Sequence, residues 1–554
     1  MTSNVTVGAL QIASSQTAPV HVLVDPGMTL TVVGSLTITG NAAHPVVFTE
    51  RSAGQGWGGF LFQGAPTPLL LEHCIIEKAT NSGVRVVDSG LVLRHCLIRG
   101  NSTQFTGGGI LAVNNNSDLV LEDCEIRDNS ALNSGGGLHA TIGPGFALNM
   151  NRCRVWGNAG NRANLNTGSQ NSGGGLFLQG HGYLGNCHFR ANFVHTHSYG
   201  CSIQVGQGGA IYATAGDLAL TNCILVDNLA HGNGAGSGCY LGGLGRGGGV
   251  AFNANGNALT MTSCFVCGNQ SEAAYGDLFR EGSGLAILNA ASVAIMNCTF
   301  ARNNKEAVRN YSATAAVSIA NSILFFNNDL NTSPTPTYGP QLVVHPGATA
   351  IAATYSDVQN GVAGIGNINV NPFFLRPDSA LGGPVIHPAS PCVDAGDPSG
   401  PMDAALPPAR GTTRNDMGAH GGQLAGQFSS PCLMVGGAQT YGTTRGGANT
   451  LLLDWVPSVN PLVGNVRVQN AGSNDPGTVL VSLADDEFQI GSATVLVGVG
   501  GLGMFPFSFD TSGQVQIPLS LAAPVFLGLP IYVQVLAFPP SGVAASNGLA
   551  LLFY

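Results

Sequence analysis

Apolar and polar residues alternate along this chain in short runs of four to six residues that end in glycine or asparagine. In the run from Asp118 to Ile126, for example, Leu119 and Leu121 can share one face. A period of two over so few residues is typical of β-strands, and no segment sustains the 3.6-residue apolar period of a helix. The pattern therefore predicts an all-β chain.

Nine of these runs share one motif, in which a polar residue precedes a cysteine and an apolar residue lies two positions beyond it. Serine replaces cysteine in the ninth. The step between successive motifs is shortest from Cys74 to Cys96 and longest from Cys223 to Cys264, so the motif is fixed although the period is loose. Such repetition is typical of a solenoid with coils of unequal length. The ladder positions are Cys74, Cys96, Cys124, Cys153, Cys187, Cys223, Cys264, Cys298 and Ser322.

Two further sequence features recur in register with the ladder cysteines. A glycine cluster precedes six of them at a nearly constant separation, at 107–109, 135–137, 173–175, 208–209, 247–249 and 282–284. Asparagines follow them by five positions, at Asn129, Asn158, Asn192, Asn228, Asn269 and Asn303. We expect a right-handed parallel β-helix whose equivalent strands stack about 4.8 Å apart. The cysteines should point inward. The asparagines should adopt left-handed turns and stack their amides, and the glycines should form another corner where φ is positive or side chains would collide.

The pattern divides the chain into four parts. Residues 1–60 are expected to form an N-terminal arm or cap and the first coils, 61–345 the β-helix core, and 346–424 the closing coils and their cap. Residues 425–554 lack the motif and carry longer alternating runs, which predict a separate antiparallel β-sandwich. Polar insertions at 158–172, 195–206 and 231–245 should emerge on one side of the solenoid.

The composition limits the classes of protein to which the chain can belong. Charged residues make up 9% of the 554 residues, against about 25% in typical soluble domains. This low charge suits an extracellular body. The net charge of −9 is spread without a basic run, which argues against nucleic-acid binding. The sequence has neither an 18-residue apolar stretch nor a charged leader, so we expect no transmembrane segment, and export by another route or after removal of a signal.

The thirteen cysteines fall into two groups. The eight on the ladder are expected to be buried and reduced, because stacked side chains have parallel Cβ vectors that disfavour a disulfide. Replacing Cys153 with serine is expected to cost about 1–3 kcal/mol through a poorly satisfied hydroxyl. The better disulfide candidates are Cys201, Cys239, Cys267, Cys392 and Cys432.

The coils resemble right-handed parallel β-helix repeat proteins of bacterial surfaces. The segments 355–359, 371–374, 390–397 and 416–419 are similar to the closing module of a large secreted β-helix family. The runs at 517–519, 527–534 and 546–549 resemble a terminal domain common in exported planctomycete proteins. These resemblances imply the fold and export, and they imply no particular activity.

Many parallel β-helices cleave acidic polysaccharides, so catalytic residues have to be considered. Glu122, Asp123, Glu125 and Asp128 crowd one coil with Arg127, either as a calcium and base site or as a solvated outer face. The Gly-His-Gly around His181 resembles a polygalacturonase motif, but the aspartate pairs of that family are missing. A histidine in a turn is the simpler interpretation.

Metal ligands are sparse in the pattern. The spacing of the histidines predicts no metal site, apart from a faint signal at His195, His197 and Cys201. Cys264 and Cys267 have CxxC spacing, but Cys264 belongs to the ladder and redox activity is not expected. Four acids of the closing module form a weak calcium candidate, with turn capping as the alternative: Asp394, Asp397, Asp403 and Asp416.

These observations favour a non-enzymatic extracellular structural or adhesive protein that associates with itself or with a cell-surface glycan. In the sharper form of this hypothesis, subunits join head to tail. Residues 4–12 would then complete a neighbour's sheet through Val5, Val7, Leu10 and Ile12. The alternative is a carbohydrate-active enzyme or a glycan-binding β-helix.

Overall fold

The structure is a computed structural model. It describes residues 5–14, 18–64, 69–160, 171–196, 205–232, 244–273, 280–328, 338–376, 385–386, 389–400 and 414–422, together with the backbone of eleven strands between 437 and 552. Every regular element in these ranges is a strand. A helix of the length and apolar character needed to cross a membrane is therefore absent from the described residues.

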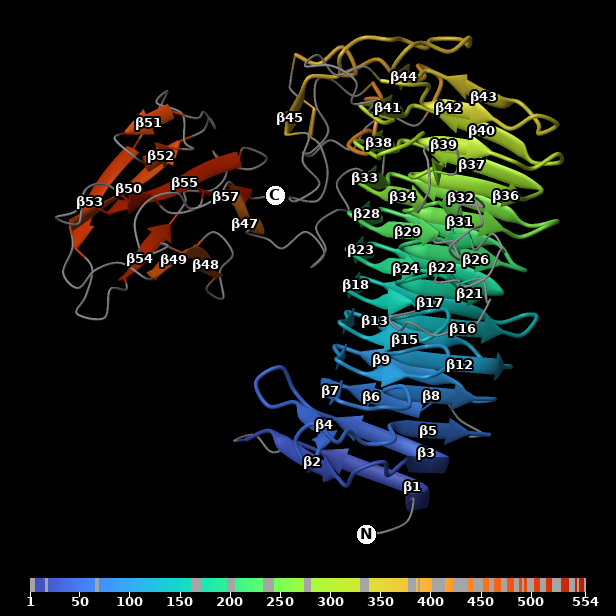
Figure 1. The fold of residues 1–554 in the computed structure, drawn as a ribbon, viewed down its shortest axis with the longest axis vertical. Coiled ribbons are helices and arrows are strands. Elements are labelled where there is room, and N and C mark those ends of the chain that lie inside the picture. Colours follow the sequence, from blue (N-terminus) through green and yellow to red (C-terminus); the bar gives the residue numbers. More distant parts are fainter. Residues whose placement is uncertain are drawn as a thin grey trace, which may run out of the picture. The chain divides into compact units, whose positions relative to one another are not determined.

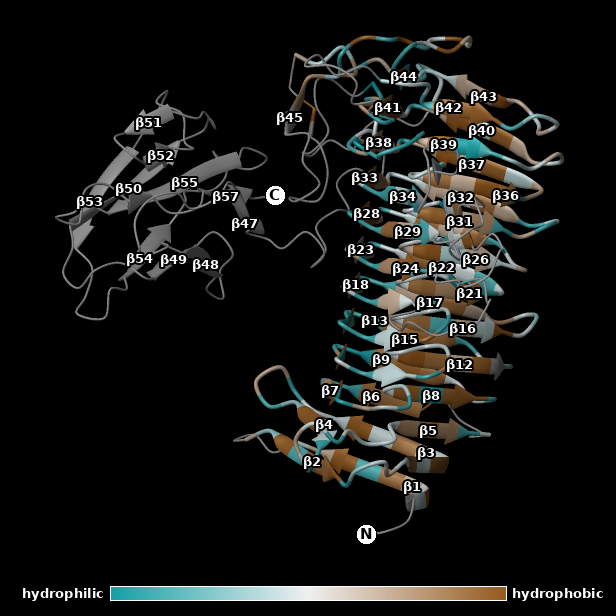
Figure 2. Ribbon diagram, viewed as in Figure 1, coloured by the Kyte–Doolittle hydropathy of each residue, from teal (hydrophilic) through white to brown (hydrophobic). Residues whose placement is uncertain are grey.

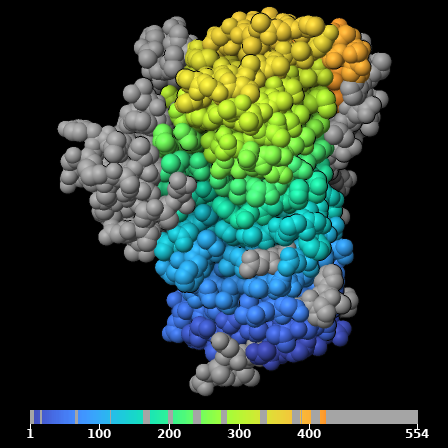
Figure 3. Space-filling view, turned by 90° about the vertical axis from the view of Figure 1, so that its right-hand side faces the viewer, coloured from blue at the N-terminus to red at the C-terminus, as the bar shows by residue number. Residues whose placement is uncertain are grey.

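The chain divides into two compact units. One comprises Met1–Ala405 and Ala409–Phe428, and the other comprises Leu406–Pro408 and Ser429–Tyr554. The first unit is a parallel β-helix, so the predicted fold class is confirmed (Figure 1). The space-filling view shows its coils as successive bands in sequence order, from blue to yellow (Figure 3).

The largest sheet has 22 strands and holds two strands of each coil after the first two long strands. Two long strands begin it, β1 (Val5–Ala13) and β3 (Leu30–Thr39). The first strands of the later coils are β5 (Phe60–Gln63), β8 (Val84–Val87), β12 (Ile110–Asn115), β16 (Leu138–Ile142), β21 (Leu176–Gln179), β26 (Ile211–Thr214), β31 (Val250–Asn253), β36 (Leu285–Asn289), β39 (Val308–Asn310) and β42 (Leu342–Val344). The second strands are β6 (Leu69–Glu72), β9 (Leu91–Arg94), β13 (Leu119–Glu122), β17 (Ala147–Asn151), β22 (His181–Gly185), β27 (Leu218–Thr221), β32 (Ala258–Thr262), β37 (Ser292–Met296), β40 (Ala316–Ala320) and β43 (Ile351–Thr354).

A second parallel sheet has twelve strands, most of which begin at or just after a ladder position. Two smaller parallel sheets complete the coils. The twelve strands are β2 (Val20–Val24), β4 (Val46–Glu50), β7 (Cys74–Glu77), β10 (Leu97–Arg99), β14 (Glu125–Arg127), β18 (Arg154–Trp156), β23 (His188–Arg190), β28 (Ile224–Val226), β33 (Phe265–Cys267), β38 (Thr299–Ala301), β41 (Ile323–Phe325) and β44 (Asp357–Val358). Six short strands pair as β11 (Ser102–Thr103), β15 (Ser130–Ala131), β19 (Ala159–Gly160), β24 (Phe193–His195), β29 (Leu229–Gly232) and β34 (Gln270–Ala273). Four more pair as β20 (Asn171–Ser172), β25 (Val205–Gln207), β30 (Leu244–Arg246) and β35 (Arg280–Glu281).

Alternation along each strand builds the core. In β13, Leu119 and Leu121 are fully buried while Val120 and Glu122 face outward. The pairing register places Leu121 beside Leu93 and Met150 of the adjacent coils, so every coil adds another layer to the same apolar stack. Figure 2 shows apolar strands joined by polar turns along this unit.

An asparagine ladder occupies one corner of the coils, as predicted. Each side chain is buried, and each amide donates to the amide oxygen of the next member at 2.7–3.0 Å. The same oxygen accepts a backbone N–H, and the amide also donates to a backbone carbonyl, as Asn192 does to Val155. The members are Asn101, Asn129, Asn158, Asn192, Asn228, Asn269, Asn303 and Asn327, and Gln341 ends the series.

The expected left-handed backbone does not lie at these asparagines. The residue directly before each one has positive φ instead, as in Asp128 at 54° and Asp227 at 56°. The asparagine is selected for its amide, which can donate and accept along the axis, and its neighbour makes the turn. The glycine corner behaves as predicted: Gly107 has a φ of 69°, and a Cβ on Gly108 would lie 2.4 Å from the oxygen of Gly136.

The eight ladder cysteines are at most 2% exposed, and none forms a disulfide. Their thiols donate to backbone carbonyls, as Cys153 Sγ does to the oxygens of Leu121 and Asn151 at 3.4 Å. Ser322 fills the same position, where its hydroxyl donates to Ala320 O at 2.8 Å and accepts from the N–H of Cys298. A hydroxyl is thus satisfied at a ladder position, and the expected cost of Cys153→Ser falls to less than about 1 kcal/mol.

The N-terminal strand pairs with the first part of the solenoid. β1 pairs in parallel with β3 of the same chain, from Val5 beside Leu30 to Ala13 beside Thr39. Val7, Leu10 and Ile12 are partly buried against the core, whereas the side chain of Val5 lies outside the described set. At the opposite end, residues 365–368 pair with the last coil through Tyr355 N–H to Ile365 O and Val358 N–H to Ile368 O.

The second unit consists of antiparallel strands. One sheet is formed by β47 (Gly437–Tyr441), β57 (Gly548–Leu552), β55 (Pro530–Ala537), β50 (Pro476–Ser482) and β53 (Gly503–Ser508), with β56 (Ala544–Ala545) beside β55. Another is formed by β48 (Leu452–Pro457), β49 (Val463–Gln469) and β54 (Val515–Ser520), and a hairpin joins β51 (Phe488–Ile490) to β52 (Ala493–Val495). In the first unit, β45 (Phe374–Arg376) and β46 (Val385–Ile386) are also antiparallel.

Candidate functional site

The residue before each ladder position forms a second column along the solenoid, which we call the pre-cysteine column. All its members have left-handed backbone, with φ between 49° and 54°. Short polar residues tolerate this conformation best, which explains the polar residue of the sequence motif. The members are His73, His95, Asp123, Arg152, Asn186, Asn222, Ser263, Asn297 and Asn321. Tyr355 takes the same place before Ser356, which continues the ladder by accepting the N–H of Ser322.

In the middle coils several members of this column bind one another or a strand of the preceding coil. Arg152 donates two hydrogen bonds of 2.7 Å to the two carboxylate oxygens of Asp123. Asn186 donates to Asn151 Oδ1 at 3.0 Å. The side chains of Asp123, Arg152 and Asn186 are therefore engaged with neighbours in adjacent coils.

At the C-terminal end the closing segment covers the column. Asn297 donates to Asn415 Oδ1 at 2.8 Å and to Asp416 O at 3.1 Å. Asn321 accepts the backbone N–H of Asp397 at 2.7 Å. Both asparagines are buried as a result, with 3% of each exposed.

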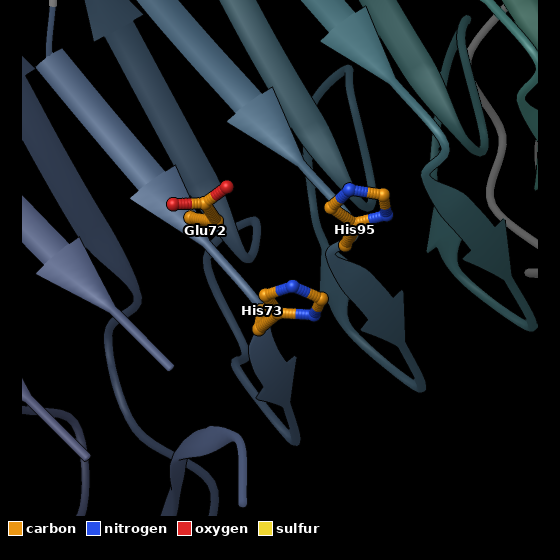
Figure 4. Close-up of side chains that lie close together, drawn as sticks. All are labelled: Glu72, His73 and His95. Carbon is orange, nitrogen blue, oxygen red and sulfur yellow. The ribbon is translucent and has the colours of Figure 1, made fainter. Parts of the chain in front are cut away.

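At the N-terminal end the column is open and carries two histidines. The rings of His73 and His95 stack with centroids 4.5 Å apart and planes 9° from parallel. Glu72, the last residue of β6, lies beside them (Figure 4). One ligand atom from each of these three side chains lies within 4.8 Å of the other two, the only such trio of His, Cys, Asp or Glu among the residues the structure describes.

The charged side chains around Glu72, His73 and His95 bind other partners and leave the carboxylate of Glu72 unoccupied. Arg94 is the strand neighbour of Glu72 but binds Glu122 of the next coil at 2.8 Å. The carboxylate of Glu72 makes no hydrogen bond or ion pair with any described residue. Asp123 Oδ2 lies 4.0 Å from His95 Nδ1, and its hydrogen bonds from Arg152 hold the pKa of this carboxyl below its usual range. An ionised carboxylate therefore lies behind the imidazole.

The expectation that the histidines assemble no metal site took account of spacing alone, and it missed this group. His73 and His95 lie a whole coil apart in the sequence, too far for a local ligand motif. The usable signal was their shared position directly before two consecutive ladder cysteines. Residues at equivalent positions of adjacent coils stack, whatever the length of chain between them.

The acids considered for catalysis lie on the surface in ion pairs. Glu122 binds Arg94, while Glu125 and Asp128 both bind Arg127 at 2.7 Å. The guanidinium of Arg127 also lies 5.1 Å from the ring centre of Trp156. This arrangement corresponds to the solvated outer face that was the alternative interpretation.

The other predicted histidines are scattered. His181 begins β22, where its Nδ1 accepts the backbone N–H of Asp217 at 3.2 Å. His195 stacks on His231 with centroids 4.4 Å apart, and Glu272 lies 3.3 Å from His231. His197 and Cys201 lie outside the described residues, so the faint metal signal there stays a prediction.

The acids of the closing module make turns in the part that can be described. Asp416 accepts the backbone N–H of Asp394 at 2.8 Å, and Asp397 accepts the N–H and hydroxyl of Ser399. Asp403 lies outside the described residues. Calcium binding by this group stays a prediction.

Two of the five disulfide candidates are free thiols. Cys267 and Cys392 are both buried and unpaired in a disulfide. Cys267 ends β33, next to the ladder, and burial raises the pKa of its thiol. Cys392 donates to Asp357 Oδ2 at 3.2 Å. Each fills an apolar or hydrogen-bonded niche with no cysteine partner, which corrects the prediction for these two. Cys201, Cys239 and Cys432 lie outside the described residues.

A shallow hollow of about 300 Å³ lies on the outer face of the large sheet. Tyr183 of β22, which is 51% exposed, forms one side. Asn149 and Asn151 of β17 add amide groups, and the small Gly185 and Ala219 leave the space open. An exposed ring beside amides can stack on a sugar and hydrogen-bond to its hydroxyls.

Neither a protein-family model nor a curated protein matches the chain. The crystal structure of pectate lyase Pel9A is a similar solved structure, with 11% sequence identity and a TM-score of 0.34. The match covers 72% of this chain and 89% of the lyase. The sites are therefore interpreted from their own residues.

Proposed function

We propose that the chain is a non-enzymatic extracellular protein with a structural or adhesive role. The observation that carries this proposal is the fate of the acids on the outer face. Glu122, Glu125 and Asp128 each bind an arginine on the same or the neighbouring coil. A lyase or hydrolase needs carboxylates directed at a substrate or a cation, and these are directed at their neighbours.

The composition of the surface supports the same role. Only 9% of residues are charged, and a long stack of coils with a hydrogen-bonded asparagine ladder gives a rigid body. An extended, charge-poor surface suits repeated weak contacts with a matrix better than it suits a small-molecule pocket.

The purified full-length chain should release no product from polygalacturonate or alginate, with or without added calcium. It should be retained on insoluble cell-wall material or form ordered assemblies visible by electron microscopy. Turnover that disappears in Asp128→Ala would contradict the proposal and favour the enzyme alternative. His181→Ala provides a second check on the hydrolase motif.

Glycan binding is a second candidate, favoured by the hollow at Tyr183. Its exposed ring and the nearby amides match the chemistry of neutral sugars, because no charge other than Glu122 lines the hollow. In affinity electrophoresis on a panel of neutral polysaccharides, Tyr183→Ala should abolish retardation. Phe105→Ala, at an aromatic residue 66% exposed elsewhere, is the matched control and should leave it unchanged.

Head-to-tail assembly is the sharper form of the structural role. β1 pairs with β3 along one edge, and its other edge has no partner among the described residues, so it can accept or supply a strand. Deleting residues 1–13 and measuring mass by analytical ultracentrifugation tests this form. Folded monomers from the deletion and polymers from the intact chain would support it, whereas equal masses would contradict it.

A further inference from the structure

We propose that Glu72, His73 and His95 form a binding site for a divalent late transition-metal ion, with Zn²⁺ as the probe. This proposal is independent of the proposed function, since neither a structural nor an adhesive role requires a bound metal ion. It rests on the convergence of three ligand atoms, their positioning by adjacent coils and the pairing of the charges around them.

The ligand set suits this class of ion. Imidazole nitrogen and carboxylate oxygen bind Zn²⁺ at about 2.0–2.2 Å, and two imidazoles with one carboxylate leave a coordination position for water or another group. Such a mixed set favours Zn²⁺, Ni²⁺ or Cu²⁺ over Ca²⁺ and Mg²⁺, which prefer oxygen ligands alone.

The distances require only small movements. Ligand atoms of one tetrahedral Zn²⁺ lie roughly 3.4 Å apart, as its bond lengths dictate, and these three lie within 4.8 Å of one another. His95 is exposed, with 45% of its side chain accessible. Rotation about χ2 of a histidine meets a broad, shallow energy well, so the exposed ring of His95 can turn from the parallel stack toward an ion shared with the half-buried His73.

The backbone holds the two histidines in place. His73 N–H donates to Arg94 O and His95 N–H donates to Glu122 O, both at 2.9 Å. Each residue also precedes a buried cysteine, so neither backbone can drift from the coil. Ordering the ligands therefore costs less entropy than it would in a mobile loop.

The surrounding charges favour a cation. Arg94 and Arg152 each bind a carboxylate of their own, Glu122 and Asp123, which leaves Glu72 as the uncompensated charge. Asp123 also lies 4.0 Å from His95 Nδ1. This separation is too long for a hydrogen bond, so the carboxylate acts only as a nearby negative charge that favours a bound cation.

The test is a Zn²⁺ titration of the metal-stripped full-length chain by isothermal calorimetry. The variants are His73→Asn and His95→Asn, because asparagine occupies the same position of the column at 186, 222, 297 and 321 and keeps the left-handed backbone. One equivalent should bind to the wild type, and each variant should weaken that binding at least 10-fold. Glu72→Gln should weaken it less.

The matched control is His231→Asn, since His231 also stacks on a histidine and lies near a glutamate without forming a converging trio. It should bind Zn²⁺ like the wild type. As a second readout, Cu²⁺ electron paramagnetic resonance should show coupling to two imidazole nitrogens in the wild type and to one in His95→Asn. Absence of a saturable equivalent, or equal affinities for wild type and His95→Asn, would overturn the proposal.

Discussion

The asparagine ladder and the pre-cysteine column are built by the same coil repeat, yet they differ in almost every other respect. The ladder is buried and nearly uniform, and each amide repeats the contacts of the one before. The pre-cysteine column changes from histidine to aspartate, arginine and asparagine along the axis. The ladder amides bind one another along the axis, so the ladder keeps one residue type. The pre-cysteine column meets different partners from coil to coil and can vary, although Asn222, Ser263, Asn297 and Asn321 are buried as well.

The two ends of the pre-cysteine column differ as well. The closing segment covers Asn297 and Asn321, whereas His73, His95 and the neighbouring Glu72 remain accessible. The same stacked geometry therefore serves as a structural joint at one end and as a candidate ligand site at the other.

The largest expected effect comes from breaking the buried ladder at Asn192→Ala. The substitution removes the acceptor of Asn158 N–H and Nδ2 and the donor to Val155 O. Several buried groups lose their partners together, so the free energy of unfolding should fall by about 4 kcal/mol. Urea unfolding followed by circular dichroism measures it. Asn116→Ala, on the exposed surface, is the control and should change stability by less than about 0.5 kcal/mol.

A smaller loss is expected where the closing segment meets the column. Asn297→Ala deletes two hydrogen bonds to Asn415 and Asp416, which are themselves buried. The free energy of unfolding should fall by about 2–3 kcal/mol. Hydrogen exchange should localise the change to residues 390–400 and 414–422. An effect spread evenly over the early coils would contradict the assignment of Asn297 as a joint.

The closed end also contains a buried acid, which makes a pH test possible. Burial raises the pKa of Asp357 to about 6, against about 3.9 in the unfolded chain. The folded state binds the proton more tightly, so the stability that this group contributes is fully present below pH 4 and is lost as the pH rises through 6.

Asp357→Asn imitates the protonated carboxyl and should remove this loss. The variant should be about 3 kcal/mol more stable than the wild type at pH 7 and equal to it at about pH 3. Urea unfolding of both proteins at unit steps from pH 3 to 7 gives the difference directly, because the titration of all other groups cancels. A difference that stays constant with pH would contradict the burial-raised pKa.

The smallest effect on stability is expected at the open end. His95→Asn should change the free energy of unfolding of the metal-free chain by less than about 0.5 kcal/mol, since an exposed side chain is exchanged for one that suits the same backbone. In saturating Zn²⁺ the thermal midpoint of the wild type should rise above that of the variant, because only the wild type gains binding energy in the folded state. Equal midpoints in both conditions would remove the contrast between the two ends.

The sequence by itself determined the coil. The spacing of Cys124 and Asn129 within one motif, and the glycines at 135–137, give local information on strands, turns and the inward face. These features depend on residues a few positions apart, so a period of two and a positive-φ glycine can be recognised without the fold. Even here, the residue that makes the asparagine turn was assigned one position too late.

Only the tertiary structure decided which residues meet across coils. Glu72 and His73 lie close to His95 because each coil, whatever its length, advances along the solenoid axis by one strand spacing. The same stacking paired Glu122 with Arg94 instead of directing it at a substrate, and it left Cys267 and Cys392 without cysteine partners. The number of residues between two positions does not predict such neighbours, because the register of the coils along the axis determines which residues meet.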